Sequence, residues 1–223
     1  MFKNYLKIAW RNLWKNKGYT FINVGGLALG MAVTLIIGLW ILDELSYNSY
    51  FKNQDKIAQV FQSQTFNGET GTGPAIPRPL EKGLRNGYSD NFKYLIMCSW
   101  TNDHYLKYGE KSISRPGNYM QKEGPEMFGL EIIKGEKDGL REINSIMLSE
   151  STANALFGNE DPIGKTVTVS NEHKLNVSSV YKDIPVNNSF NDTDFIIPWE
   201  KYLANNEWIR NAEDQWGNNS FQM

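Results

Sequence analysis

The stretch FINVGGLALGMAVTLIIGLWIL, residues 21–42, carries no charge in a chain of 223 residues of which 22% are charged. At about 1.5 Å per helical residue it spans roughly 33 Å, enough to cross a hydrocarbon core about 30 Å thick. A cleavable signal peptide has a shorter apolar region and a small-x-small exit, whereas this run ends in LWILDELSY. A buried helix of a soluble protein is seldom apolar around its whole circumference for this length. The stretch therefore predicts a transmembrane helix.

The charges that flank this stretch predict its orientation. Every charged residue before it is a cation: Lys3, Lys7, Arg11, Lys15 and Lys17. Asp43 and Glu44 follow it directly. Because lysine and arginine are retained on the cytoplasmic side, we expect the N-terminus in the cytoplasm and the chain from about Asp43 onward outside it.

The residues before the stretch form a separate element. Apolar side chains recur at helical spacing at Phe2, Tyr5, Leu6, Ala9, Trp10 and Leu13, while the cations recur every fourth residue on another face. A basic amphipathic helix of this kind is expected to lie along the membrane lipid at the cytoplasmic interface, followed by a turn over residues 16–18. The sequence thus predicts an interfacial helix over residues 1–18 and a transmembrane helix over residues 19–43.

One face of the transmembrane stretch carries small residues. Gly26, Gly30, Thr34 and Gly38 recur every fourth residue, as in the small-xxx-small patterns that let helix backbones approach closely in lipid. These residues predict a helix-packing face. No second apolar span of this length occurs in the 223 residues, so we expect the partner helix to come from another chain or from further sequence.

Composition predicts that residues 44–223 form a folded head. An apolar content of 40% with 13% aromatic residues is typical of a packed core rather than of disorder. The net charge of −2, with cations gathered at the N-terminus, leaves the head acidic and gives no reason to expect nucleic acid as a partner. Cys98 is the single cysteine, which excludes an internal disulfide and predicts a small buried apolar side chain.

The pattern of the head mixes strands and helices. We expect strands over residues 57–66, 92–100 and 146–149, a turn-rich link over 67–79, helices over 79–85 and 151–157, a helix or strand over 126–133, and two hairpins, 105–108 with 111–114 and 165–169 with 175–180. Strands that return after intervening helices favour an α+β head with mixed helix and strand content, in one or two lobes.

Candidate chemistry in the head is sparse. The run Gly164-Lys165-Thr166 is similar to the end of a phosphate-binding loop, but Asn159 stands where that motif needs glycine, and the run follows a helix instead of preceding one. His104 and His173 are 69 positions apart without cysteine partners or H-x-x-x-H spacing, which does not favour zinc. We therefore predict no enzyme activity, no catalytic residue, no cofactor and no metal.

The segment that contains Lys165 predicts a structural corner. Gly158 is expected to end a helix, Asp161 to begin a turn, Pro162 to fix φ, and Gly164 to permit an unusual backbone angle before a strand. We expect these four residues and Lys165 to serve the fold and not a ligand.

Three segments resemble one family. The stretch LKIAWRNLWKNKGYTFINVGGLALGMA, residues 6–32, resembles the start of MacB/FtsX-type ABC transporter permeases. The run IMLSESTANALFGNEDPIGKTVTV, residues 146–169, closely resembles the hallmark of that family's periplasmic core domain. The segment VYKDIPVNNSFNDTDFIIP, residues 180–198, resembles the part where that domain turns back after a strand.

The resemblance implies a permease subunit in the bacterial inner membrane with a periplasmic head. It implies a separate cytoplasmic ABC ATPase, whose ATP hydrolysis moves the head, and it allows for a periplasmic adaptor. Relatives export compounds, extract lipoproteins or regulate cell-wall enzymes, and the sequence does not choose among these tasks. The family has three further spans per core domain, so we expect a fragment or truncated product whose partners include those helices or a second permease copy. A single-pass anchored binding or sensor head remains the alternative.

Overall fold

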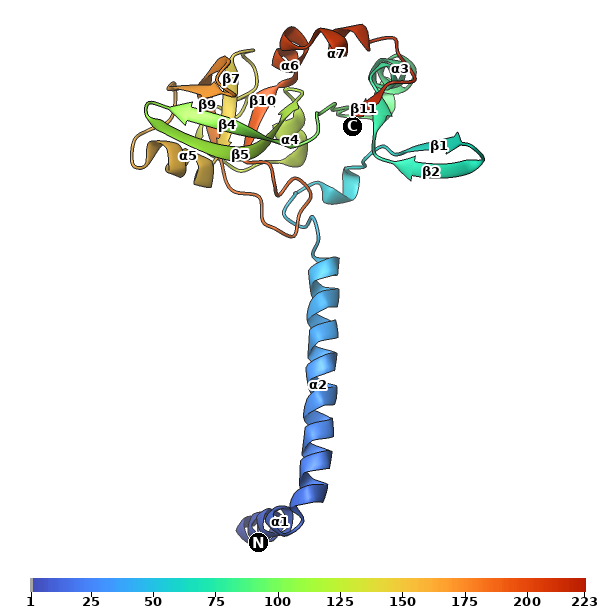
Figure 1. The fold of residues 1–223 in the computed structure, drawn as a ribbon, viewed down its shortest axis with the longest axis vertical. Helices are drawn as coiled ribbons and strands as arrows, with labels where there is room; N and C mark the ends of the chain where they lie inside the picture. The colour runs from blue at the N-terminus through green and yellow to red at the C-terminus, as the bar shows by residue number, and fades with distance from the viewer. Residues whose placement is uncertain (1) are drawn as a thin grey trace. The chain divides into compact units, whose positions relative to one another are not determined.

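The computed structural model describes residues 2–223, with only the backbone of Phe2 included. The chain divides into two compact units, one ending at Tyr47 and the other running from Asn48 to Met223. Figure 1 shows the ribbon of both units.

The first unit consists of two helices. Helix α1 runs over Phe2–Lys15 and helix α2 over Lys17–Leu45. The predicted turn over residues 16–18 is shorter than expected, because only Asn16 leaves helical geometry, with φ −111° and ψ 54°. The Thr20 hydroxyl donates to the carbonyl oxygen of Leu13 at 3.0 Å and so bridges the break. Helix α2 is long and apolar enough to cross a membrane, with a mean hydropathy of 2.2 over its most apolar window.

The second unit is built on a seven-stranded sheet in the order β6-β9-β7-β10-β5-β4-β8, in which β9 also pairs with β8. This extra pairing closes six of the strands into a barrel, and β6 lies outside the ring against β9. The strand bounds are β4 Asn102–Tyr108, β5 Lys111–Met120, β6 Ile132–Gly135, β7 Ser145–Ser149, β8 Thr166–Val169, β9 His173–Tyr181 and β10 Phe195–Pro198. Pairs β7–β9 and β5–β10 are parallel, and the other pairs are antiparallel.

Two of the barrel strands, β7 and β10, bury side chains on both faces. In β7, Ile146 and Leu148 join one apolar cluster and Met147 joins another, because successive side chains of a strand point to opposite faces. In β10, Phe195 and Ile196 divide between the two clusters in the same way. Burial on both faces explains why these strands read as continuous apolar runs and not as alternating ones.

Helices lie next to the barrel, and one further helix and a two-stranded hairpin lie off to one side of it (Figure 1). The helices are α3 Pro79–Tyr88, α4 Gly124–Phe128, α5 Glu150–Phe157, α6 Trp199–Asn205 and α7 Glu207–Asn211, with 3₁₀ turns at Gln54–Lys56 and Ser89–Asn91. Strands β1 Gln62–Phe66 and β2 Glu69–Gly73 form a separate hairpin, and β3 Ile76–Pro77 pairs with β11 Asn219–Phe221. The predicted α+β class is confirmed.

Three expected elements before β4 differ from the structure. The strand expected over residues 57–66 begins only at Gln62, and the expected link over 67–79 contains strand β2, which turns back at Asn67 and Gly68 with φ of 51° and 85°. Residues 92–100 form no strand, although most are buried, because their backbone groups bond to scattered partners. Arg85 donates to the Leu95 carbonyl oxygen at 2.7 Å, and the Met97 amide donates to the Gln121 side chain at 2.9 Å.

The expected hairpins and the helix before Gly158 are present. Strands β4 and β5 pair with Tyr108 opposite Lys111, and β8 and β9 pair with Val169 opposite His173. Helix α5 ends at Phe157. The segment expected over 126–133 as one helix or strand is divided between α4 and β6, because Gly129 takes a left-handed conformation, with φ 66°, and ends α4.

Candidate functional site

The small-residue face of α2 has no partner among residues 2–223. A Cβ atom placed on Gly26, Gly30 or Gly38 meets no atom within 4 Å. The Thr34 hydroxyl donates to the Gly30 carbonyl oxygen at 2.8 Å, so its polar group is satisfied within the helix. The face is therefore open for close helix contact, and its packing role stays a prediction.

The residues around Lys165 form a corner between α5 and β8. Helix α5 begins at the Ser149 cap, whose hydroxyl accepts from the Thr152 amide at 3.3 Å, and it stops at Gly158, with φ 61° and ψ −118°. Gly164 has φ 77°, and its amide donates to the Val177 carbonyl oxygen at 2.8 Å. Both glycines occupy conformations that side chains disfavour.

Side chains at the corner bond to one another. Lys165 forms an ion pair with Glu160, and its ammonium lies 5.3 Å from the centre of the Tyr108 ring. The hydrogen bond from Lys165 lowers the pKa of the Glu160 carboxyl. The Asp161 carboxylate accepts from the Ile163 amide at 3.4 Å, next to Pro162. These contacts are local, and they join the corner to β4 through Tyr108.

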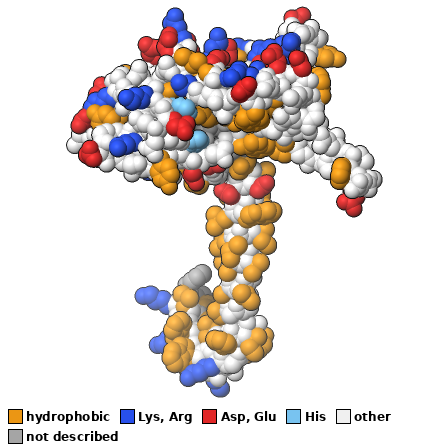
Figure 2. All heavy atoms as spheres, turned by 45° about the horizontal axis from the view of Figure 1, so that its top comes forward, with side chains coloured by type: hydrophobic (Ala, Val, Ile, Leu, Met, Phe, Trp, Pro, Cys, Tyr) orange, Lys and Arg blue, Asp and Glu red, His pale blue; other side chains and the backbone are white. Residues whose placement is uncertain are grey.

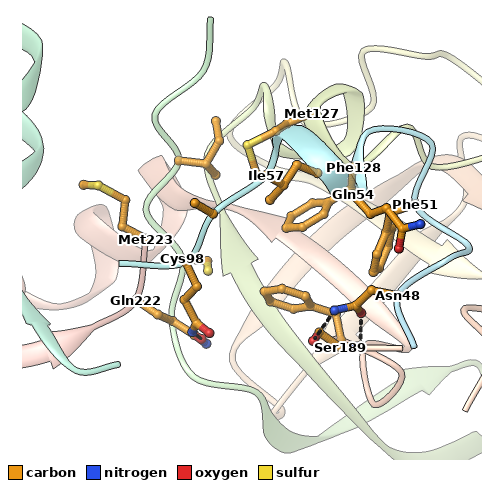
Figure 3. A pocket seen from close by; sticks show the side chains of 14 residues that line it. Asn48, Phe51, Gln54, Ile57, Cys98, Met127, Phe128, Ser189, Gln222 and Met223 are labelled. Atoms are coloured by element: carbon orange, nitrogen blue, oxygen red, sulfur yellow. Dashed lines mark hydrogen bonds between the residues drawn. The ribbon is translucent and has the colours of Figure 1, made fainter. Parts of the chain in front are cut away.

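A second group of interacting residues, which the sequence did not reveal, lies where the head begins. The Asn48 side chain accepts from the Ser189 amide at 2.6 Å and donates to the Ser189 hydroxyl at 3.3 Å, while the Asn48 amide donates to the Asn187 carbonyl oxygen at 3.0 Å. The Tyr50 amide donates to the buried Asn188 side chain at 3.3 Å. We call these bonds between residues 48–50 and 187–189 the Asn48 clamp, and Figure 3 shows the bonds between Asn48 and Ser189.

Aromatic rings continue the clamp into the apolar core. Phe51 is 4% exposed, and its ring centre lies 5.2 Å from that of Phe128, which lies 5.0 Å from that of Phe190. Phe190 has φ 63°, a strained value for a bulky residue, and its ring contacts offset that cost. The first residues of the head are therefore fixed both by hydrogen bonds and by packing.

A mainly apolar cavity of about 170 Å³ lies beside these rings. Figure 3 shows its lining, which includes Ile57, Cys98, Met127 and Met223. Burial raises the pKa of the Cys98 thiol to about 12, so the thiol is protonated and unreactive at neutral pH. The prediction that Cys98 is a small buried residue is confirmed.

The structure brings together His104, in β4, and His173, in β9, although they are 69 positions apart in the sequence. Both His104 and His173 line one polar hollow at the side of the barrel. Within residues 2–223, no group of three or more His, Cys, Asp or Glu side chains is arranged to hold a metal ion. Only long-range pairing of β4 with β8 places His104 near His173, so sequence spacing carried no signal of it.

Comparisons with known proteins agree with this architecture. The sequence profile of the MacB-like periplasmic core domain matches residues 20–219. A permease-protein domain from Porphyromonas gingivalis is similar in structure, with a TM-score of 0.62, 20% identity, and coverage of 77% of this chain and 73% of that chain. The extracellular domain of the noncanonic ABC-type transporter YknZ from Gram-positive bacteria has a TM-score of 0.51, 16% identity, and coverage of 74% and 80%.

The periplasmic region of MacB from Actinobacillus actinomycetemcomitans has a TM-score of 0.49 at 18% identity, with 66% of each chain covered. No curated protein matched the sequence. The family profile spans nearly the whole chain, from the transmembrane stretch to β11. The chain therefore belongs to the family of MacB-like periplasmic core domains.

Proposed function

We propose that this chain is part of a permease in which a separate cytoplasmic ABC ATPase drives movement of the extracytoplasmic head. The observation that carries the proposal is the Asn48 clamp, because it ties the first residues of the head to the loop that joins β9 to β10. Family membership and the apolar helix α2 support the same assignment.

The clamp favours transmission of motion over loose tethering. Asn48 follows Leu45, the last residue of α2, after two intervening residues. A displacement of Asn48 would pull on the loop at Ser189, and both ends of that loop enter strands of the closed barrel. A flexible Gly/Ser linker at this point would absorb such a displacement instead.

The proposed arrangement assigns a task to each part of the chain. Residues 1–18 lie at the cytoplasmic interface, residues 19–43 span a bacterial inner membrane, and residues 44–223 face the periplasm. The face formed by Gly26, Gly30, Thr34 and Gly38 packs on further helices of the permease or on a second permease copy, and the head meets a periplasmic adaptor. The proposed task of this chain is mechanical: it transmits motion for export or for work in the cell envelope, and it catalyses no reaction itself.

Purification of the tagged full chain from its native membranes tests this proposal. We expect an ABC ATPase to co-purify, the ATPase to account for all ATP hydrolysis, and the reading frame beyond Met223 to encode further spans. In the recovered complex, ATP should change hydrogen exchange at residues 187–190. An Asn48→Ala variant should reduce that change, whereas Asn53→Ala, whose side chain makes one exposed bond to the Met127 carbonyl oxygen, should not.

Two results would contradict the proposed function. A folded chain that recovers no ATPase, or whose exchange at residues 187–190 is indifferent to ATP, would favour an anchored binding or sensor head.

A further inference from the structure

The polar hollow that holds both histidines has the size and composition of a ligand site. Its volume is about 340 Å³, within the range of small-molecule sites of about 300–1,000 Å³. Four parts of the head meet there: residues 99 and 100, the strands β4 and β5, the turn between β8 and β9, and helix α6 with the residue after it. Figure 2 shows the two histidines, in pale blue, close together on one face of the head.

Aromatic rings form one part of the hollow. Tyr119 and Tyr202 stack with ring centres 4.5 Å apart, and His104 meets Tyr119 edge to face at 6.3 Å. Trp100 also lines the hollow and is 38% exposed. Because the two tyrosines stack on each other, the lining is held rigid before any ligand arrives.

The polar groups around these rings include both donors and acceptors. Among residues 2–223, the hydroxyls of Tyr119 and Tyr202 have no hydrogen-bond partner. His104 Nδ1 lies 3.0 Å from the Ser170 hydroxyl, and the Asn205 amide group lies 3.2 Å from His173 Nε2. Burial lowers the pKa of His104, so its imidazole is neutral at neutral pH.

The charge of the lining narrows the class of ligand. Glu172 is its only acidic residue, and no lysine or arginine of the described chain lines the hollow. A phosphate or carboxylate ligand would lack a cation and face Glu172, while a purely apolar ligand would leave the polar groups without partners. A sugar fits better, because its hydroxyls both donate and accept and its C–H face packs on aromatic rings.

We propose that this hollow binds a neutral saccharide unit. Trp100 and the edge of Tyr202 pack against the sugar ring, and the hydroxyls of Tyr119 and Tyr202 bond to its hydroxyls together with Glu172 and Asn205. An ammonium group is the competing ligand, since Glu172 and aromatic rings attract cations, but the stacking of Tyr119 on Tyr202 hides a face of each ring from it. The proposal does not depend on ATPase coupling.

Binding to the full chain in lipid nanodiscs, which contain no glycoside detergent, tests the proposal. The probes are tri-N-acetylchitotriose, maltotriose and spermidine, measured by calorimetry and by saturation-transfer NMR. We expect at least one trisaccharide to bind. Tyr202→Phe and Glu172→Gln, each removing one hydrogen bond or weakening it, should raise its Kd about threefold to tenfold. Tyr105→Phe is the matched control, since Tyr105 is exposed on the same strand as His104 but outside the hollow.

Three results would overturn the proposal. These are the absence of trisaccharide binding at millimolar concentration, equal binding by parent and both variants, and binding of spermidine in place of the sugars. Near-ultraviolet circular dichroism of each variant separates lost binding from lost folding, and Tyr202→Phe preserves the ring stack.

Discussion

Replacing Asn48 by alanine should release the loop that contains Ser189. The change removes two side-chain hydrogen bonds, at 2.6 and 3.3 Å, each contributing about 0.5–1.5 kcal/mol. Asn48 also has φ 62°, which asparagine tolerates and which costs alanine about 1 kcal/mol or more. The local free energy of opening should therefore fall by about 2–4 kcal/mol. Asn48→Gly removes the same two bonds without the conformational cost, so it should lower the local free energy of opening by an amount at the lower end of this range.

Hydrogen exchange at the Ser189 amide measures this loss directly, because that amide donates to the Asn48 side chain. At tenfold per 1.4 kcal/mol, the exchange rate of the full chain in nanodiscs should rise about thirtyfold or more. Asn53→Ala, a change of the same kind in the same segment, should leave Ser189 unchanged. Exchange at Ser189 within threefold of the parent in Asn48→Ala would refute the clamp as a mechanical link.

Three further predictions concern the head. Gly164→Ala should lower the thermal midpoint by about 2–8 °C, since φ of 77° adds backbone strain of about 1–2 kcal/mol and no clash. Gly158→Ala should lower it at least as much, because φ of 61° with ψ of −118° lies outside the left-handed helical region that other residues can adopt. Gly87→Ala, within α3, should not lower it. Asn118→Leu should raise stability by about 1–2 kcal/mol in urea unfolding, because Asn118 is fully buried and neither amide atom has a partner in the described chain; an unchanged or lower midpoint would contradict this. Burial lowers the pKa of His104 in the folded state, an effect that Asp103 opposes and His173 reinforces. The free energy of unfolding should therefore be highest above the usual histidine pKa of about 6.5 and decline as pH falls below it. The decline between pH 7.5 and 5 should be smaller in His104→Gln than in the parent, which checks the sign.

The sequence predicted those parts of the fold that depend on near neighbours. The apolar run of α2, the hairpin at Gly109, and the stop of α5 at Gly158 each follow from residues within one element or one turn. The corner at Gly164 belongs to the same class, because a positive φ is a local demand that glycine meets. The hairpin at Asn67 was missed although Asn-Gly is a strong turn signal, because its strands are short, polar and exposed.

Closure of the barrel and the histidine hollow could not be predicted in this way. Strand β9 pairs with β8 over its first residues and with β6 over its last, and no local pattern indicates that a strand divides one edge between two partners. Residues 92–100 have the composition of a strand, yet side chains such as Arg85 satisfy their backbone carbonyl groups. Long-range partners decide both cases, and they override local propensity.

The loop before β10 shows why composition alone misjudges the Asn48 clamp. Its run PVNNSFND reads as a polar surface turn, but Asn188 is 1% exposed, accepts from the Tyr50 amide and donates to the Pro185 carbonyl oxygen at 3.1 Å. Asparagine serves here as a substitute for regular pairing, because its side chain satisfies backbone groups that lie outside any sheet. The proposed transmission of motion requires a firm attachment where α2 ends. Asn48 and Asn188 supply such an attachment through side-chain hydrogen bonds, without extending either α2 or the barrel.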